Sequence, residues 1–164
     1  MEAVLAQIMG VSETGAPGRV HGGVILRICD EAAGVAATRH ARKRVVTAGV
    51  DRVSFRRPVY VGEVLTVFAR VNAVWRTSAE VGVRVTAQPL DSDEARHVLS
   101  AYFTMVAVGE DGAPLAVPSL SVTDISSPDA QRRERAANLR RRGRLAEREA
   151  LVGGADAPPT SARQ

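Results

Sequence analysis

The stretch VILRICDEAAGVAATR, residues 24–39, decides the fold of this chain. Its apolar residues cover most of the circumference of a helix, and such a helix is normally buried on most of its sides. Only one stripe of this helix is polar, and it contains Arg27, Asp30 with Glu31, Gly34 and Thr38. The spacing therefore predicts one long buried helix that carries a carboxylate-bearing stripe.

After this helix, apolar residues recur at every second position, which is the period of a β-strand. The pattern predicts four strands, at residues 45–55, 64–76, 79–88 and 96–108. Residues 1–21 contain only a short apolar run, followed by a loop rich in glycine, serine, threonine and proline. We therefore expect a single α+β domain in which an antiparallel sheet wraps around the helix. The outer face of that sheet would be partly apolar, so a homo-oligomer is expected.

The excess positive charge lies near the C-terminus. The 164-residue chain has a net charge of +4, and residues 125–164 hold nine arginines and five acidic residues, so residues 1–124 carry no net charge. We interpret residues 1–124 as the domain and residues 125–164 as an arginine-rich helix, at 129–151, with a flexible end at 153–164. The helix is expected to be solvated, the alternative being an arm that binds anions. It lacks aromatic residues, which argues against a nucleic-acid partner.

The composition excludes several classes of protein. Hydrophobic residues make up 45% of the chain and charged residues 24%, which is typical of globular proteins. The longest apolar stretch, residues 98–109, is shorter than the roughly 20 residues of a membrane-spanning helix, and the first nine residues do not resemble a secretory signal.

Cys29 is the only cysteine, so we expect a cytoplasmic protein in which this residue is part of the core rather than a nucleophile. The three histidines are too scattered for a zinc site, and no phosphate-binding loop or dinucleotide motif is present, so neither a metal nor an organic cofactor is expected.

Two groups on the helix are candidates for chemistry. His21, Gly22 and Gly23 precede it, and free amides at a helix N-terminus can donate to a developing negative oxygen; the alternative is an ordinary tight turn. Asp30 is either solvated or held in a cleft, where desolvation would make it a better base. Glu31 competes for that role, but it points about 100° away around the helix.

The spacing of these two groups limits how they could cooperate. Asp30 and Gly22 are eight residues apart, which is about 12 Å along a helix. One reacting group cannot touch both within a protomer. If two copies pair with antiparallel helices, however, Asp30 of one copy approaches Gly22 of the other, and a dimer would have two such sites.

The sequence around these residues resembles that of a known family, the hotdog-fold acyl-CoA thioesterases, and most closely the brain-type acyl-CoA hydrolase group. The resemblance begins with GRVHGGVIL at 18–26 and DEAAG at 30–34, and continues through TRH at 38–40, VTAGVD at 46–51, RP at 57–58, GE at 62–63, TSAEV at 77–81, AYFT at 101–104 and VPSL at 117–120. It covers most of residues 8–122. It implies a sheet wrapped around a helix, homodimers with continuous sheets and two interface sites, and frequent assembly as a trimer of dimers.

The resemblance also implies roles for individual residues in the hydrolysis of acyl-CoA to a free carboxylic acid and coenzyme A. Asp30 would attack the thioester carbonyl or activate a water, and the Gly22 amide of the partner subunit would hold the oxyanion. Thr47 would orient the water or the carboxylate. The turn residues Arg76, Thr77 and Ser78 would follow the pantetheine and phosphate path, the alternative for Arg76 being a solvated charge. His21 would support the loop or act as a general acid, and Gly23 would let the backbone come close to the substrate.

At one position the sequence departs from the family pattern. Many relatives have an asparagine in the loop before the glycines, and that place is occupied here by Gly15. We therefore expect a slow enzyme, with Thr14 or His21 as the residues that could replace the missing amide. The alternatives are a catalytically weak acyl-CoA-binding protein, and a hotdog hydratase or dehydratase in which a histidine faces the acid. The acyl chain length cannot be predicted from one chain.

Overall fold

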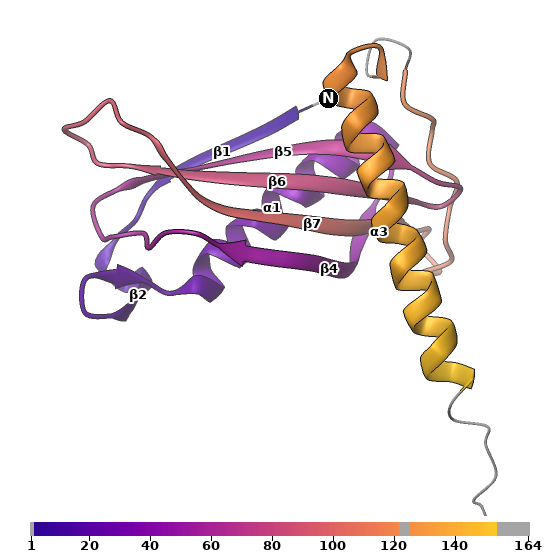
Figure 1. Cartoon of the computed structure of the whole chain (residues 1–164), viewed down its shortest axis with the longest axis horizontal. Helices are drawn as coiled ribbons and strands as arrows, with labels where there is room; N and C mark the ends of the chain where they lie inside the picture. Colours follow the sequence, from indigo (N-terminus) through magenta and orange to yellow (C-terminus); the bar gives the residue numbers. More distant parts are fainter. Residues whose placement is uncertain (1, 122–124, 154–164) are drawn as a thin grey trace, which may run out of the picture.

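The computed structural model describes residues 2–121 and 125–153, and it contains one five-stranded antiparallel sheet with a long helix on one face (Figure 1). The strands of this sheet are β1 (Glu2–Ile8), β4 (Val45–Phe55), β5 (Val64–Val74), β6 (Ser78–Gln88) and β7 (Arg96–Ala107), in the order β1-β5-β6-β7-β4. The long helix is α1 (Gly22–Ala41). The expected hotdog arrangement, an α+β fold with a sheet around a buried helix, is confirmed.

Both ends of helix α1 are set by capping residues. Its N-cap is His21, whose Nδ1 accepts a hydrogen bond from the Gly23 N–H at 2.9 Å, and its C-cap is Arg42 in the left-handed conformation. The helical residues that face the sheet are mostly alanine, which allows a close approach to the strands. They form one core with the alternate residues of β5, β6 and β7, and the buried members from α1 are Ile25, Ile28, Cys29, Ala32, Ala33, Ala36 and Ala37.

The four predicted strands occur within two residues of their expected ends, but the edge strand β1 was missed. Residues 2–8 pair with β5 over their whole length, with Ala3 buried. A seven-residue run with a single fully buried position is too short to distinguish a strand from a loop by periodicity. The adjoining loop contains the 3-10 turn η1 (Val11–Glu13) and a small hairpin, β2 (Thr14–Ala16) with β3 (Arg19–Val20).

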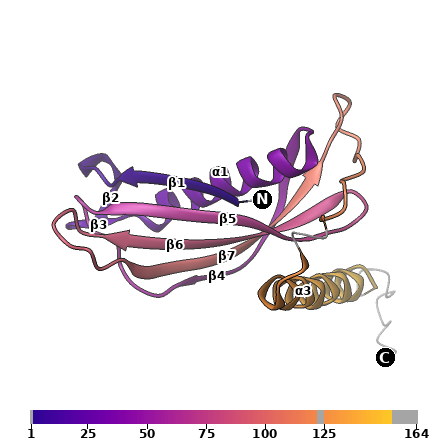
Figure 2. The ribbon, with the colours of Figure 1, turned by 90° about the horizontal axis from the view of Figure 1, so that it is seen from above.

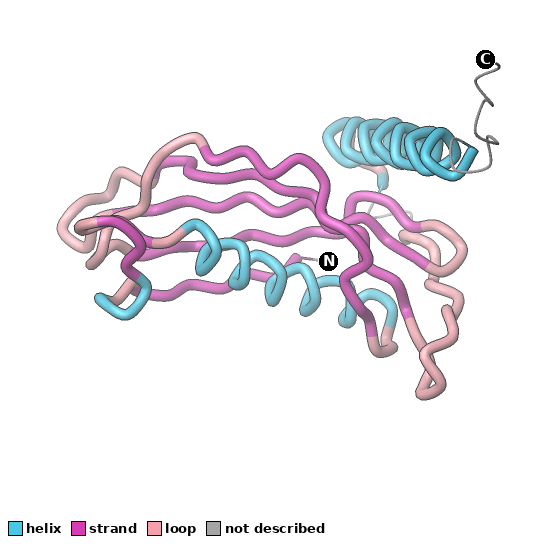
Figure 3. Tube along the Cα trace, turned by 90° about the horizontal axis from the view of Figure 1, so that it is seen from below, coloured by secondary structure: helices cyan, strands magenta, loops and turns pink. Residues whose placement is uncertain are grey.

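The C-terminal helix α3 (Pro128–Gly153) matches the predicted position, but the expectation that it is solvated is wrong. It docks on the face of the sheet opposite α1, as Figures 2 and 3 show. Trp75 Nε1–H donates to Asn138 Oδ1 at 2.9 Å, Arg140 pairs with the buried Glu80, and Ala137 is buried. The helix is therefore part of the folded body. Apart from Gly153, the flexible end predicted at 153–164 lies outside the described residues.

Within residues 2–121 and 125–153, no helix is both long enough and apolar enough to cross a membrane. The same residues contain no group of three or more histidine, cysteine, aspartate or glutamate side chains that could hold a metal ion.

Candidate active site

The structure brings Asp30 and Thr47 into direct contact. Asp30 lies in the middle of α1, and Thr47 lies near the start of the edge strand β4. The Thr47 hydroxyl donates to Asp30 Oδ1 at 2.6 Å, and the same hydroxyl is 3.6 Å from Met105 Sδ. The register of β4 against β7 shifts between Thr47 and Gly49, so Ala48 is an extra residue in the ladder. Such bulges re-aim neighbouring side chains, and they are frequent next to active sites.

This hydrogen bond fixes one carboxylate oxygen of Asp30, and no described protein group donates to the other. A carboxylate held at one oxygen and free at the other can bind a water or face an electrophile. Glu31 does not share this position, because its carboxylate pairs with Arg27 on the exposed side of the helix. Burial, followed by the negative charge of Asp30, raises the pKa of the Cys29 thiol to about 12. Cys29 therefore stays a thiol in the core, as the sequence predicted, and cannot act as a thiolate nucleophile near neutral pH.

Gly22 is the first residue of α1 and lies against the last residue of β4. A Cβ atom at Gly22 would be 3.2 Å from Phe55 Cζ, so the close approach of that ring favours glycine. The two residues line a hollow of about 330 Å³ together with Val20, Ile25, Pro58 and Val59. The Gly23 N–H is taken by the His21 ring, whereas the Gly22 N–H has no partner among the described residues. The free amide at this end of the helix is therefore that of Gly22.

Within one protomer, Gly22 and Asp30 lie at opposite ends of β4. Gly22 contacts Phe55 at the end of this strand, and Asp30 contacts Thr47 near its start. Eight strand residues span about 27 Å, which is farther than one reacting group can bridge. β4 is also an edge strand, and its side chains are partly exposed: 47% for Val50 and 52% for Phe55. The edge that carries both groups is thus open to a second copy of the chain.

Gly15 packs so closely against His21 that no side chain fits there. A Cβ atom at Gly15 would be 2.9 Å from His21 Cδ2 and 3.0 Å from His21 Cα. An asparagine in this place would have to displace the residue that caps α1. Thr14 does not replace the missing amide, since its hydroxyl donates to Val11 O at 2.7 Å within the same turn. The His21 ring does not replace the missing amide either, because its Nδ1 accepts the Gly23 N–H at the start of α1.

The turn residues Arg76, Thr77 and Ser78 do not contact Asp30. They form the connection between β5 and β6, and they are fixed through their backbones: the Val117 N–H donates to Arg76 O and the Ala107 N–H donates to Thr77 O. Ser78 pairs with Val106, which pairs in turn with Val46 on β4. This turn therefore lies at the Thr47 end of the sheet, but two strand spacings away, about 10 Å.

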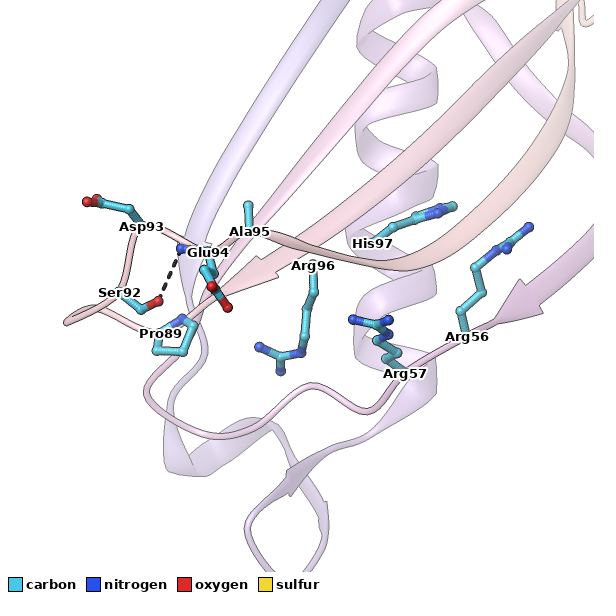
Figure 4. A pocket seen from close by; sticks show the side chains of 9 residues that line it. All are labelled: Arg56, Arg57, Pro89, Ser92, Asp93, Glu94, Ala95, Arg96 and His97. Atoms are coloured by element: carbon cyan, nitrogen blue, oxygen red, sulfur yellow. Dashed lines mark hydrogen bonds between the residues drawn. The ribbon is translucent and has the colours of Figure 1, made fainter.

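One cavity was not found from the sequence, and its lining includes three arginines together with Asp93 and Glu94. It has a volume of about 740 Å³ and lies between the end of β4 and the β6–β7 hairpin (Figure 4). Arg56 and Arg57 directly follow Phe55 and line this cavity beside Arg96, whose charge is neutralised by Glu63. The same two arginines also line the hollow that contains Gly22. The sequence pattern alone did not single out Arg56, although two adjacent arginines beside a free amide are a signal for anions.

The chain is similar to several known proteins. A model of the thioesterase superfamily matches residues 17–92. An uncharacterized acyl-CoA thioester hydrolase of Zymomonas mobilis is 37% identical over 131 residues, which are 80% of this chain and 88% of that protein. Protein VdlD of Helicobacter pylori is 44% identical over 99 residues, but these are 60% of this chain and only 56% of that protein. Among solved structures, an apo-hexameric acyl-CoA thioesterase superimposes with a TM-score of 0.84 and 33% identity, covering 92% of this chain and 94% of that one.

Proposed function

The chain belongs to the thioesterase superfamily, and from this premise we propose that it hydrolyses acyl-CoA to a free carboxylic acid and coenzyme A. One observation supports the proposal: the two groups to which we assign catalysis lie at opposite ends of the same open edge strand. Asp30 with Thr47 stands near the start of β4, and Gly22 with Phe55 stands at its end.

A homodimer would join these halves into complete sites. If β4 pairs with its own copy in antiparallel fashion, with the two-fold axis near Asp51, Thr47 faces Phe55 of the partner subunit. Gly22 of the partner subunit then lies beside Asp30. Because the pairing is symmetric, the dimer has two such sites. A hexamer, as in the solved thioesterase, would be a trimer of these dimers.

In the proposed reaction, the acyl carbonyl accepts a hydrogen bond from the Gly22 amide of the partner subunit. The carboxylate of Asp30 either attacks the carbonyl carbon or removes a proton from an attacking water. The carbonyl oxygen then carries the negative charge that the amide stabilises, and collapse of this intermediate breaks the C–S bond and releases coenzyme A as thiolate. In the first route, loss of the thiolate leaves a mixed anhydride between Asp30 and the acyl group, which water then hydrolyses to regenerate the carboxylate. In both routes one water supplies the second oxygen of the carboxylic acid, one of its protons goes to the thiolate, and the other stays on the acid. Thr47 holds the carboxylate at Oδ1 throughout.

This chemistry needs neither a metal nor an organic cofactor, because the thiolate is a good leaving group and one base with one oxyanion donor can suffice. Arg56 and Arg57 have no ion-pair partner among the described residues, lie next to Gly22 and are candidates to pair with the phosphates of coenzyme A. Arg76 is a candidate too, because its turn lies at the Thr47 end of the sheet, which the dimer brings to the Gly22 end of the partner subunit. We also propose that the enzyme works in the reducing cytoplasm, where a lone thiol such as Cys29 stays reduced.

A second candidate function is binding of acyl-CoA with little turnover. It is favoured by Gly15, because the loop has no room for the amide that many relatives have. A hydratase or dehydratase is less well supported, since Nδ1 of the His21 ring accepts the Gly23 N–H as a helix cap and is not available for acid–base chemistry.

The test is thiol release from short, medium, long and aromatic acyl-CoAs by the full chain and by Asp30→Asn. The variant should lose most of the activity, about 100-fold or more, while its oligomeric state is unchanged. If Asp30→Asn releases thiol as fast as the parent on every substrate, the proposal is wrong. If calorimetry shows binding by a parent that releases no thiol, the second candidate replaces it.

A further inference from the structure

Helix α3 extends past the edge of the sheet on which it lies. Arg140 of this helix contacts Glu80 on the central strand β6. One turn later, Arg144 pairs with Asp51 on the edge strand β4. The helix therefore runs outward from the middle of the sheet, and residues 145–153, here called the overhang, continue for about 13 Å beyond Arg144. Figure 1 shows this end of α3 projecting beyond β4.

The overhang continues the side of α3 that packs on the sheet. Residues seven positions apart lie on nearly the same side of a helix, about 20° from each other. Ala137 is completely buried, Arg144 follows it by seven residues, and Leu151 follows Arg144 by seven more. Leu151 therefore faces nearly the same way as Ala137, yet it is 73% exposed, because the sheet of its own protomer ends at β4. A second sheet beyond β4 would cover this leucine.

The overhang also differs in charge from the rest of α3. Residues 128–144 contain seven arginines and two acidic residues, whereas residues 145–153 contain one arginine and two glutamates, Glu147 and Glu149. Neither glutamate has an ion-pair partner among the described residues. The last turn of α3 contains no basic residue, so nothing in this turn balances the negative end of the helix dipole. The overhang is therefore suited to a basic surface.

A basic surface is present on the same face of the sheet, beside α3. It is a hollow of about 590 Å³ lined by five arginines and by one carboxylate, which belongs to Glu2. Ser100 of β7 and Arg84 of β6 line it side by side, because they are register partners. Arg84 is exposed and has no acidic partner among the described residues. Its guanidinium group is therefore free to pair with a negative group from outside the protomer.

This inference rests on the β4 dimer proposed above, which brings the overhang and the hollow together. With the two-fold axis near Asp51, the sheets of the two subunits are continuous, so β4 and β7 of the partner subunit are the next two strands beyond β4. At about 4.8 Å per strand, they lie about 5 and 10 Å away. The overhang, which is about 13 Å long, therefore crosses both of them.

The strand register indicates which part of the partner subunit lies below the overhang. In each subunit, the cross-strand row of Glu80, on which α3 lies, reaches β4 at Gly49. The axis places Gly49 opposite Val53 of the partner subunit. The next residue along β4, Ser54, pairs with Ser100 of β7 in either subunit. The overhang therefore lies over Ser100 of the partner subunit, at the border of that subunit's basic hollow.

We propose that the overhang docks on the outer face of the partner subunit, so that each subunit of the dimer holds the other with the end of its α3. Leu151 packs over β7 beside Ser100 of the partner subunit and loses its exposure to water. Arg84 of the partner subunit stands at the C-terminal end of the helix, where positive charge is favourable. The two-fold axis relates the two contacts, so the dimer has both.

The position of the overhang can be tested by cross-linking the full chain with a short bismaleimide. Leu151→Cys combined with Ser100→Cys should give a covalent dimer on a denaturing gel, because these positions meet only between subunits. The parent should give no covalent dimer, since Cys29 is completely buried. Leu151→Cys alone should give none either, because the two overhangs point away from each other across the axis.

The contribution of the overhang to the dimer can be measured by analytical ultracentrifugation. Leu151→Asp should raise the dissociation constant of the dimer about 100-fold, since two leucines lose their contact and each contributes about tenfold. Leu139→Asp is the matched control and should leave the dissociation constant unchanged. This leucine is on the same helix and is 67% exposed, but it precedes Arg140 and so lies over its own sheet.

Thiol release separates this inference from the proposed function. An active double-cysteine protein that forms no covalent dimer would overturn the docking and leave the thioesterase standing. A covalent dimer from a parent that releases no thiol would support the docking and overturn the activity. Equal dissociation constants for Leu151→Asp and the parent would overturn the docking, and a monomeric parent would overturn both proposals.

Discussion

Glu80 on β6 receives two hydrogen bonds from Arg140 of α3, at 2.9 and 2.6 Å, and its side chain is completely buried. Asn72 donates a third, at 3.1 Å, and the Arg140 guanidinium lies 3.6 Å from the centre of the Tyr102 ring. Burial by itself lowers the pKa of Arg140, but the hydrogen bonds and charge of Glu80 outweigh it and the net direction is upward. Arg140 therefore stays charged, and its two hydrogen bonds to Glu80 hold α3 on the sheet.

Removing the arginine should destabilise the protein strongly, because it leaves a buried carboxylate with one neutral donor. For Arg140→Ala we expect a loss of about 3 kcal/mol in the free energy of unfolding, measured by urea titration. Arg140→Ala combined with Glu80→Gln should recover part of this loss, since no charge then remains buried. Equal stability of the single variant and the parent would contradict this account.

The hydroxyl of Thr47 should matter for turnover rather than for folding. We expect Thr47→Val, which keeps the shape but not the donor, to lower kcat by about 10- to 100-fold. Thr47→Ser keeps the hydroxyl and should stay within a few-fold of the parent. Steady-state thiol-release kinetics of the three proteins provide the measurement, and a fully active valine variant would remove Thr47 from the site.

Cys29 should make stability depend on pH in the alkaline range. Its pKa is raised from 9.0 to about 12 in the folded protein, so above pH 9 the unfolded chain loses this proton while the native one keeps it. The free energy of unfolding should therefore fall between pH 9 and 12 by about 1.4 kcal/mol per pH unit from this group. Cys29→Ala has no titrating thiol at this position. The free energy of unfolding of the parent minus that of the variant should therefore become smaller as the pH rises from 9 to 12. A difference that is constant with pH would show that the thiol titrates alike in both states.

Gly15 and Gly34 should respond oppositely to substitution by alanine. A Cβ atom at Gly15 meets His21 at 2.9 Å, whereas at Gly34, inside α1, it meets nothing within 4 Å. Gly15→Ala should therefore lower stability by about 1–3 kcal/mol, and Gly34→Ala should raise it by up to about 1 kcal/mol. Thermal melts compare the two, and a stabilising Gly15→Ala would show that the loop adapts easily.

The edge of β4 should control both assembly and activity. With the two-fold axis of the proposed dimer near Asp51, Val50 faces Arg52 of the partner subunit, so Val50→Lys places two like charges opposite each other. We expect this variant to be a monomer by light scattering and to lose thiol release, because each site needs two subunits. Val4→Lys on the other edge strand, β1, is the control and should leave both unchanged. A dimeric, active Val50→Lys protein would exclude pairing through β4.

The sequence predicted the core of this fold well, because α1 and the strands after it are long and strongly periodic. It also singled out Asp30, Gly22 and Thr47, and the structure places these at two ends of β4. Their catalytic roles remain predictions.

What the sequence could not predict depends on contacts between distant segments. The docking of α3 rests on pairs such as Arg140 with Glu80, which are 60 residues apart, and a periodicity argument treats such charges as solvated. The cavity lined by Arg56 and Arg57 forms only when the end of β4 meets the β6–β7 hairpin. The exclusion of a side chain at Gly15 depends in the same way on where His21 folds back.

The docked helix also limits how copies of this protein can be arranged. With α3 lying across the back of the sheet, two sheets cannot stack back to back over their full area. Contacts that join dimers into larger oligomers must therefore be made by strand ends, loops or α3 itself. Residues 128–153 of α3 contain eight arginines and four acidic residues. Such like-charged helices repel each other at low ionic strength, so added salt should favour larger particles over isolated pairs.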